Sequence, residues 1–303
     1  MEKEQIIQIL DSAKSEADSL SAKLGADVIF FSGDINYDAS RELVDQCNKR
    51  NRKNDALLIL VTGGGDGDAA YKMARHLQRK YGKFSVFVPG WCKSAGTLIA
   101  CGASQIYMGD HAEFGPLDIQ LSKKDDIWSR RSGLNVDASV TALDSTAKKM
   151  YFEYLHHIKQ VHPSVTYKTA ADIAVNLIGK LLSPVYAQID PSDIGECSRL
   201  MSIAMNYAKR LDQTAKNFRS EKTLAFLVES YPDHGFVIDR VEAAEIFTHV
   251  NEPTSEMQVL EEKLGTAAIV PADDDEEETF ELRYVSKEEP KLAVVSNTTG
   301  EGA

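Results

Sequence analysis

The sequence has no long apolar run, since no stretch of about 18 or more consecutive apolar residues occurs among its 303 residues. The first twenty residues, MEKEQIIQILDSAKSEADSL, are acidic and helix-like, whereas a secretory signal has a basic region followed by an apolar core. We therefore expect neither a membrane span nor a secretory signal. Its length and its 43% content of hydrophobic residues suit one large folded domain or two smaller ones.

Cysteine is also scarce. Cys47, Cys92, Cys101 and Cys197 are too few and too widely spaced for a disulfide framework, and no CxxC pair offers a zinc site. We expect a reduced, cytoplasmic setting, and no metal or organic cofactor is implied. Cys92 and Cys101 could be thiol nucleophiles, but their small or apolar neighbours favour a role as packed small hydrophobes.

Basic residues are outnumbered, with 34 Lys and Arg against 46 Asp and Glu and a net charge of −12. The imbalance lies mostly in residues 251–303, which hold 14 acids and 4 bases. The remaining body is nearly neutral, so a nucleic-acid-binding body is not expected. We expect 251–303 to be a flexible acidic tail, because the six consecutive acids at 273–278 repel one another. It either keeps the protein soluble or docks on a basic protein partner.

Apolar runs alternate with helical patterns in the first half of the chain. This alternation predicts a parallel sheet covered by helices, with ligands or chemistry at the carboxyl ends of the strands. Further on we expect a helical layer over about 140–230, and then a turn, a short strand and a closing helix over 232–250. These elements place a single domain at 1–250, followed by the tail. The expected strands are 28–31, 56–61, 84–88 and 105–108, and the expected helices are a segment from Tyr37, 68–81, a segment from Ser94, and segments near 142–161, 166–182 and 195–230.

The first candidate for chemistry is the glycine-rich loop in VTGGGDGDAAYKMA. Gly65, Gly67 and Ala70 nominally match a dinucleotide fingerprint, but Asp66 and Asp68 would face the pyrophosphate and no ribose-binding acid follows. A P-loop is excluded too, since no Lys-Ser or Lys-Thr stands at the required spacing. The loop is therefore either an oxyanion loop or a plain tight turn.

The second candidate is Ser94, in a turn between a strand and a helix. A hydroxyl there lies at the positive end of the helix dipole, and the N–H of Ala95 could stabilise an oxyanion. The simpler interpretation is that Ser94 only caps the helix. The turn differs from the elbow of α/β-hydrolases, because Cys92 stands where the first glycine should be.

Taken together, three motifs resemble the Clp-protease/crotonase superfamily, and within it the serine dehydrogenase proteinase family, which is similar to signal peptide peptidase A. Thr62-Gly63-Gly64-Gly65 resembles a TPGG segment, Lys93 to Ala100 a nucleophile segment like MSGGTLIA, and His111 to Gln120 a segment like HAxxGPxDPQ. The stretch from Tyr231 to Ala244, with His234, resembles the closing segment more weakly. The resemblance covers about 28–121, and it departs from the family at three positions, Gly63, Ala95 and Ile119.

The resemblance implies an α/β fold of repeated β-β-α/β-α units with a parallel sheet. It makes Ser94 the nucleophile, with Ala95 and either Gly64 or Gly65 donating N–H groups to an oxyanion. A serine nucleophile needs a base. Where Clp proteases have histidine, this chain has Phe114 or Gly115, which favours a lysine. The candidate bases and orienting groups are Lys123, Lys124, Lys148, Lys149, His111 and Asp118; Lys93 adjoins Ser94, but neighbouring side chains on a turn usually diverge.

The function expected from these residues is that of an ATP-independent serine endopeptidase that acts on peptide or protein substrates through an acyl-enzyme. Relatives assemble into oligomers, so a homo-oligomer is expected. One alternative is an acyl-CoA enzyme with the same oxyanion architecture, although the nearly neutral body lacks a basic CoA-binding patch. The other is an inactive scaffold that kept the fold, oligomerises and binds partner proteins.

Overall fold

A six-stranded sheet forms the centre of the molecule. The computed structural model describes residues 8–9, 11–49, 53–117, 120–122, 130–233, 235–271 and 280–284. Five strands run parallel, and β10 pairs antiparallel with β1 at one edge. The four strands predicted from apolar runs are confirmed within a few residues. The order across the sheet is β10 (Phe280–Tyr284), β1 (Ala26–Gly33), β2 (Asp55–Val61), β3 (Phe84–Val88), β5 (Gln105–Met108) and β9 (Val250–Asn251).

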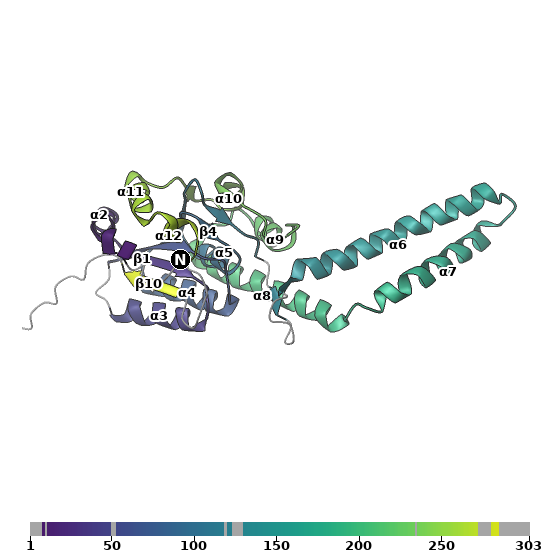
Figure 1. Cartoon of the computed structure of the whole chain (residues 1–303), viewed down its shortest axis with the longest axis horizontal. Helices are drawn as coiled ribbons and strands as arrows, with labels where there is room; N and C mark the ends of the chain where they lie inside the picture. Colours follow the sequence, from purple (N-terminus) through teal and green to yellow (C-terminus); the bar gives the residue numbers. More distant parts are fainter. Residues whose placement is uncertain are drawn as a thin grey trace, which may run out of the picture.

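Helices cover both faces of this sheet (Figure 1). Alternate residues of a strand point to opposite faces, so Ile29 and Phe31 enter one apolar core while Val28 and Phe30 enter the other. Because both faces are buried, the strands are continuous apolar runs. The first core includes side chains of α3 (Tyr37–Lys49) and α4 (Gly67–Lys80), and the second those of α2 (Lys14–Leu24), α11 (Ser255–Leu264) and α12 (Thr266–Ile269).

The acidic tail expected from residue 251 onwards does not begin there. Met257, Leu260 and Leu264 of α11 are buried in the second core, and β10 belongs to the central sheet. The acids of 251–303 concealed this, because an average over the segment hides apolar residues at helical spacing. The run at 273–278 lies outside the described residues.

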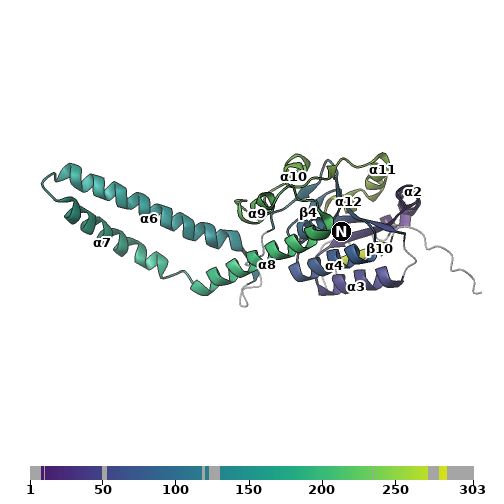
Figure 2. The ribbon, with the colours of Figure 1, turned by 180° about the vertical axis from the view of Figure 1, so that it is seen from behind.

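The expected helical layer over 140–230 is a projecting hairpin instead. In both views α6 (Gly133–Val161) and α7 (Tyr167–Tyr186) extend away from the body, and α8 (Pro191–Ala215) leads back to it (Figures 1 and 2). The single helix predicted over 195–230 is wrong, since α8 ends at Ala215 and a non-helical segment separates it from α9 (Glu221–Glu229). Lys216 there has a φ of 53°, and Ser220 and Thr223 form a capping box that starts the new helix.

Three short elements bring separate loops together at the carboxyl ends of the strands. β4 (Trp91–Cys92) pairs in parallel with β6 (Glu113–Phe114), and α5 (Ala95–Ala100) follows β4 after two residues. Beyond β6, β7 (Gln120–Ser122) and β8 (Arg130–Ser132) form a separate two-stranded sheet before α6. The closing helix predicted over 232–250 is α10 (Arg240–Ile246), and the bridge of Ile238 to Phe114 holds the segment before it.

Candidate active site

Ser94 occupies a strained turn between β4 and α5. Its backbone has a φ of 47° and a ψ of −108°, and it is one of two non-glycine residues with positive φ in the described part of the chain. Its side chain makes no capping hydrogen bond to α5. The simpler interpretation of Ser94 as a cap is therefore wrong. Sparsely populated backbone conformations cost about 1–3 kcal/mol and persist only where the surrounding structure holds them.

The glycine-rich loop lies directly against this turn. Gly64 has a φ of 121°, and a Cβ on it would lie 3.0 Å from Ser94 Cβ and 3.6 Å from Ala95 N. Gly65 has a φ of 133°, and a Cβ there would overlap the carbonyl oxygen of Ile35. Hence the fold brings together the two motifs that the sequence separates by about thirty residues.

The acid in this loop has a structural task. Asp66 caps α4, since its carboxylate accepts a hydrogen bond of 2.7 Å from the N–H of Ala69. Its own N–H donates to Ile35 O at 2.7 Å. Asp66 therefore fixes the glycine-rich loop to α4 and to the segment after β1.

Two backbone N–H groups near Ser94 differ in their partners, those of Gly64 and Ala95. The N–H of Gly64 donates to Thr62 Oγ1 at 3.0 Å, and its carbonyl accepts from Ile35 N at 2.8 Å. The N–H of Ala95 is the first in α5, and N–H groups in a first helical turn have no partner within the helix. Of the expected oxyanion donors, Ala95 directly follows Ser94, whereas Gly64 has its N–H engaged with Thr62.

Close packing of α5 sets the direction of the turn. A Cβ on Gly96 would lie 2.5 Å from Thr62 Cγ2 and 2.9 Å from Cys92 Sγ, so only glycine fits there. Thr97 is fully buried, and its hydroxyl lies 2.8 Å from Gly115 O and 3.1 Å from Cys92 O. These contacts tie α5 to the segment that follows β6.

Burial raises the pKa of the Cys92 thiol strongly, and the nearby charge of Lys93 opposes this rise. Burial is also the main reason that the pKa of Cys101 is raised, and Asp212 adds to it. Raised pKa values keep both thiols neutral near pH 7. Both cysteines are fully buried in the first core, as small hydrophobes would be.

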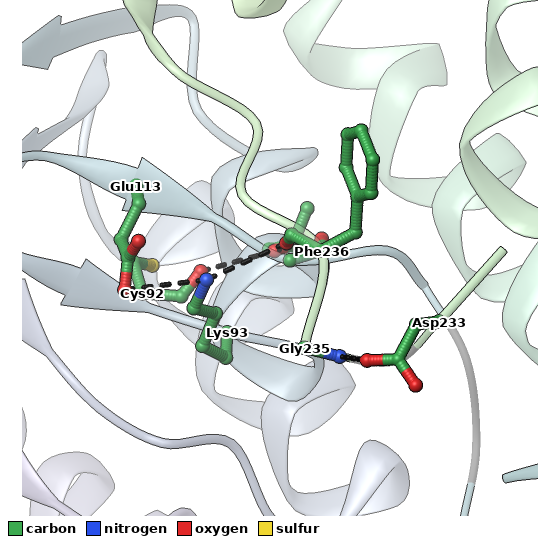
Figure 3. Close-up of polar contacts among 8 residues, drawn as sticks. Cys92, Lys93, Glu113, Asp233, Gly235 and Phe236 are labelled. Atoms are coloured by element: carbon green, nitrogen blue, oxygen red, sulfur yellow. Dashed lines mark hydrogen bonds and ion pairs between the residues drawn. The ribbon is translucent and has the colours of Figure 1, made fainter. Parts of the chain in front are cut away.

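No catalytic role was expected for Lys93 from its place beside Ser94 in the sequence. Its Nζ lies 3.2 Å from Glu113 Oε1 and donates to Phe236 O at 3.4 Å (Figure 3). The two charged side chains are only 12% and 17% exposed. The available signal was a lysine next to the expected nucleophile and a glutamate inside the third motif.

Of the remaining site candidates, the structure describes His111, Lys148 and Lys149. His111 is exposed, and its interaction with Glu261 of α11 opposes the rise that burial causes in the pKa of Glu261. Lys148 is exposed on α6 and binds Asp144 at 2.6 Å, which raises its pKa. Lys149 lies 3.9 Å from Glu153 on the same helix. The positions of Asp118, Ile119, Lys123, Lys124 and His234 lie outside the described residues.

The described residues offer neither a metal site nor a membrane-crossing helix. They contain no group of three or more His, Cys, Asp or Glu side chains that could hold a metal ion. In the same part of the chain, no helix combines the length and the apolar character needed to cross a membrane.

The protein is thus of the mixed α/β class, with a parallel sheet and a glycine-rich loop that lies against the turn at Ser94. Residues 25–130 match the family model described as ClpP-like SDH-type serine proteinase, which confirms the resemblance drawn from the three motifs. The match ends before α6, so it covers the site and most of the sheet.

Two curated relatives are uncharacterized proteins of Methanocaldococcus jannaschii. One is 34% identical over 89 residues, which is 29% of this chain and 31% of that protein. The other is 36% identical over 66 residues, which is 22% of this chain and 23% of that protein. The chain thus covers less than a third of either relative.

Similar solved structures include two mutants of the 1510-N membrane-bound stomatin-specific protease. One has a TM-score of 0.42 and 15% identity and covers 77% of this chain and 81% of its own. The other, in complex with a substrate peptide, has a TM-score of 0.29 and 23% identity over 40% and 57% of the two chains. A putative enoyl-CoA hydratase/isomerase from Acinetobacter baumannii has a TM-score of 0.20 and 12% identity, and covers 64% and 83%.

Proposed function

We propose that the protein is an ATP-independent serine endopeptidase that cleaves peptide bonds through an acyl-enzyme on Ser94. The observation that carries the proposal is the backbone of Ser94, which is held at a φ of 47° against Gly64 and does not cap its helix. The match of residues 25–130 to a serine proteinase family supports the same chemistry. A strained backbone at the end of a strand is typical of a serine that is presented to a substrate as a nucleophile.

In the proposed reaction the Oγ of Ser94 attacks the carbonyl carbon of a peptide bond while a base takes the hydroxyl proton. The negative charge that develops on the carbonyl oxygen is stabilised by N–H groups, of which Ala95 supplies one. The second comes from Gly65, or from Gly64 once its N–H leaves Thr62 Oγ1. The amine departs with the proton, and water then hydrolyses the ester to release the acid.

The proposed base is a lysine. Lys123 and Lys124 follow β7 directly in the sequence, and the segment before β7 contacts the turn, since a Cβ on Gly115 would lie 3.3 Å from Ser94 N. Lys148 is the less suitable candidate in this conformation, because its bond to Asp144 favours the protonated form. His111 and Asp118 are proposed as orienting groups at most.

The proposal includes a homo-oligomer. Along α7 an apolar row faces solvent at a spacing of four residues, formed by Ile173, Leu177, Leu181 and Val185, which are 38–49% exposed. A contiguous apolar row of this kind favours contact between copies of the chain. A cytoplasmic location and a protein partner for the acidic residues at 273–278 belong to the same proposal, which includes no nucleic acid.

Covalent labelling tests the nucleophile. After incubation with a fluorophosphonate, the intact mass of the wild type is expected to rise by one adduct, and Ser94→Ala is expected to gain none. Ser12→Ala is the matched control, because Ser12 is exposed and its hydroxyl donates to Ile9 O within the N-terminal helical segment. Adducts on wild type and on Ser94→Ala alike would contradict the assignment.

The same assay identifies the base. We expect one of Lys123→Ala and Lys124→Ala to lose at least 90% of the labelling rate, and Lys148→Ala to retain it. Labelling of the wild type with full retention in all three variants would exclude a lysine from this set. No adduct on any form of the protein would instead favour the scaffold.

A further inference from the structure

Lys93 and Ser94 are neighbours whose side chains point to different surroundings. The Cβ of Ser94 faces Gly64 of the glycine loop, whereas Cδ of Lys93 would lie 3.0 Å from a Cβ on Gly115. The ammonium of Lys93 then contacts Glu113 and Phe236 (Figure 3). The Lys93 ammonium therefore binds acceptors on two other segments, whereas the Ser94 side chain lies beside the glycine-rich loop.

The two acceptors belong to segments far apart in the sequence. Glu113 begins β6, which pairs with β4 immediately before Lys93. Phe236 lies in the segment before α10, where Gly235 N donates to Asp233 Oδ1 at 2.7 Å and forms a turn. One ammonium thus joins the serine turn, the β6 strand and the closing segment.

Within the described part of the chain, backbone hydrogen bonds join β6 to the closing segment at Phe114 and Ile238. Phe114 and Ile238 exchange two hydrogen bonds of 2.9 and 3.0 Å. Phe236, two residues earlier, is 37% exposed, and Val237 is 52% exposed. The hydrogen bond from the Lys93 ammonium to the Phe236 carbonyl links the closing segment to the residue before Ser94.

Charge and burial make this link specific. Lys93 and Glu113 are 12% and 17% exposed, whereas the ion pair of Lys148 with Asp144 is 72% and 57% exposed. Exposed pairs are screened by water and hold little in place, while a mostly buried pair fixes its groups in one geometry. Ser94 needs such support, because its backbone conformation persists only if its surroundings hold it.

We propose that Lys93 is a positioning residue for the Ser94 site, whose ammonium fixes β6 and the closing segment 233–238 to the serine turn. This inference rests on the proposed role of Ser94. Lys93 itself takes no proton and touches no substrate in it.

Two variants separate positioning from simple charge balance. Lys93→Met removes the ammonium and leaves the Glu113 carboxylate buried without it, so both the thermal stability and the labelling rate at Ser94 are expected to fall, the rate by at least tenfold. Lys93→Met combined with Glu113→Gln removes both charges. It is expected to regain most of the thermal stability, yet to label at least fivefold more slowly than wild type, because the Phe236 carbonyl has still lost its donor.

The matched control is Lys23→Met. Lys23 on α2 forms an ion pair with Glu256 on α11, away from the serine turn. This variant is expected to label at the wild-type rate. Wild-type labelling rates in Lys93→Met, or in the double variant, would overturn the positioning role while leaving Ser94 as the nucleophile.

Amide hydrogen exchange tests the link without relying on activity. Exchange in peptides that cover 235–239 is expected to be at least fivefold faster in Lys93→Met and in the double variant than in Lys23→Met. Unchanged exchange would overturn the proposal. If the wild type itself gains no fluorophosphonate adduct, the role of Ser94 fails, and the exchange result still decides whether Lys93 fixes the closing segment.

Discussion

Ser94 and Gly64 both have a positive φ, and they face each other. Ser94 has a φ of 47° and Gly64 a φ of 121°, and a Cβ on Gly64 would lie 3.0 Å from that of Ser94. Glycine adopts such φ values without steric cost, whereas an alanine does not. At the scale of single residues, the site therefore depends on the absence of one methyl group.

Gly64→Ala is expected to lower the free energy of unfolding by about 1–3 kcal/mol, since it introduces a strained φ and a crowded Cβ. Labelling at Ser94 is expected to slow by at least tenfold. In Gly63→Ala, where a Cβ has no atom within 4 Å, denaturant unfolding should show a change below about 0.5 kcal/mol. Equal stabilities of the two variants would contradict the crowding.

The buried cysteines predict a pH dependence. Because the pKa values of Cys92 and Cys101 are raised in the folded protein, both thiols stay protonated while an unfolded chain ionises above about pH 8.5. The unfolded state then binds fewer protons than the folded state, so the free energy of unfolding should fall as the pH rises above that value.

Alkylation measures directly whether the two thiols are buried and protonated in the folded protein. At pH 8 iodoacetamide is expected to modify neither Cys92 nor Cys101 in the folded protein within an hour, and both in denaturant. Rapid modification of either thiol in the folded state would contradict their burial.

At the scale of elements, α5 is held by its smallest residue. Gly96 lies against Thr62 at the end of β2 and Cys92 at the end of β4, so this short helix can approach both strands. Glycine in a helix normally costs stability compared with alanine, so its presence at this position is explained by packing. The approach of α5 also sets where Ser94 lies.

Gly96→Ala is therefore expected to destabilise the protein by about 1–3 kcal/mol, because the new methyl group would overlap Thr62 Cγ2 and Cys92 Sγ. Gly195→Ala is the comparison, since Gly195 is exposed on α8 and a Cβ there meets no atom within 4 Å. It should stabilise the protein by about 0.5–1 kcal/mol through helix propensity. Urea denaturation measures both, and effects of the same sign would contradict this reasoning.

At the scale of the whole molecule, the α6–α7 hairpin is the feature that the body does not need for its own core. It extends from the α/β body in both views (Figures 1 and 2), and the row formed by Ile173, Leu177, Leu181 and Val185 faces solvent. An isolated hairpin buries little of its apolar surface, which favours contact with another copy of the chain.

Leu181→Glu is expected to shift the proposed oligomer towards monomer, because it places a charge in the middle of this row. Lys168→Glu also adds negative charge on α7, but on the side of the helix away from the row, and is expected to leave the assembly unchanged. Light scattering after size exclusion measures both masses. A wild type that is monomeric at micromolar concentration would contradict the proposed assembly.

The sequence by itself determined the parallel sheet and the two loops of the candidate site. Runs of buried apolar residues are local signals, and so are the glycines and the serine that interrupt them, because each reports the environment of its own segment. Ser94 and the Gly64 loop could be singled out for this reason. Periodicity also predicted α7 within a few residues at both ends, whereas α6 begins earlier than expected, at Gly133, and α8 ends earlier, at Ala215.

Only the tertiary structure decided which of these residues meet. Whether Ser94 caps its helix depends on a backbone angle that α5 and Gly64 impose from other segments. The ion pair of Lys93 depends on a strand and a loop up to 143 residues away. The tail boundary, too, was set by a core that buries Met257 and Leu260 of an acidic segment. Contacts across such separations follow from chain packing, and no local pattern encodes them.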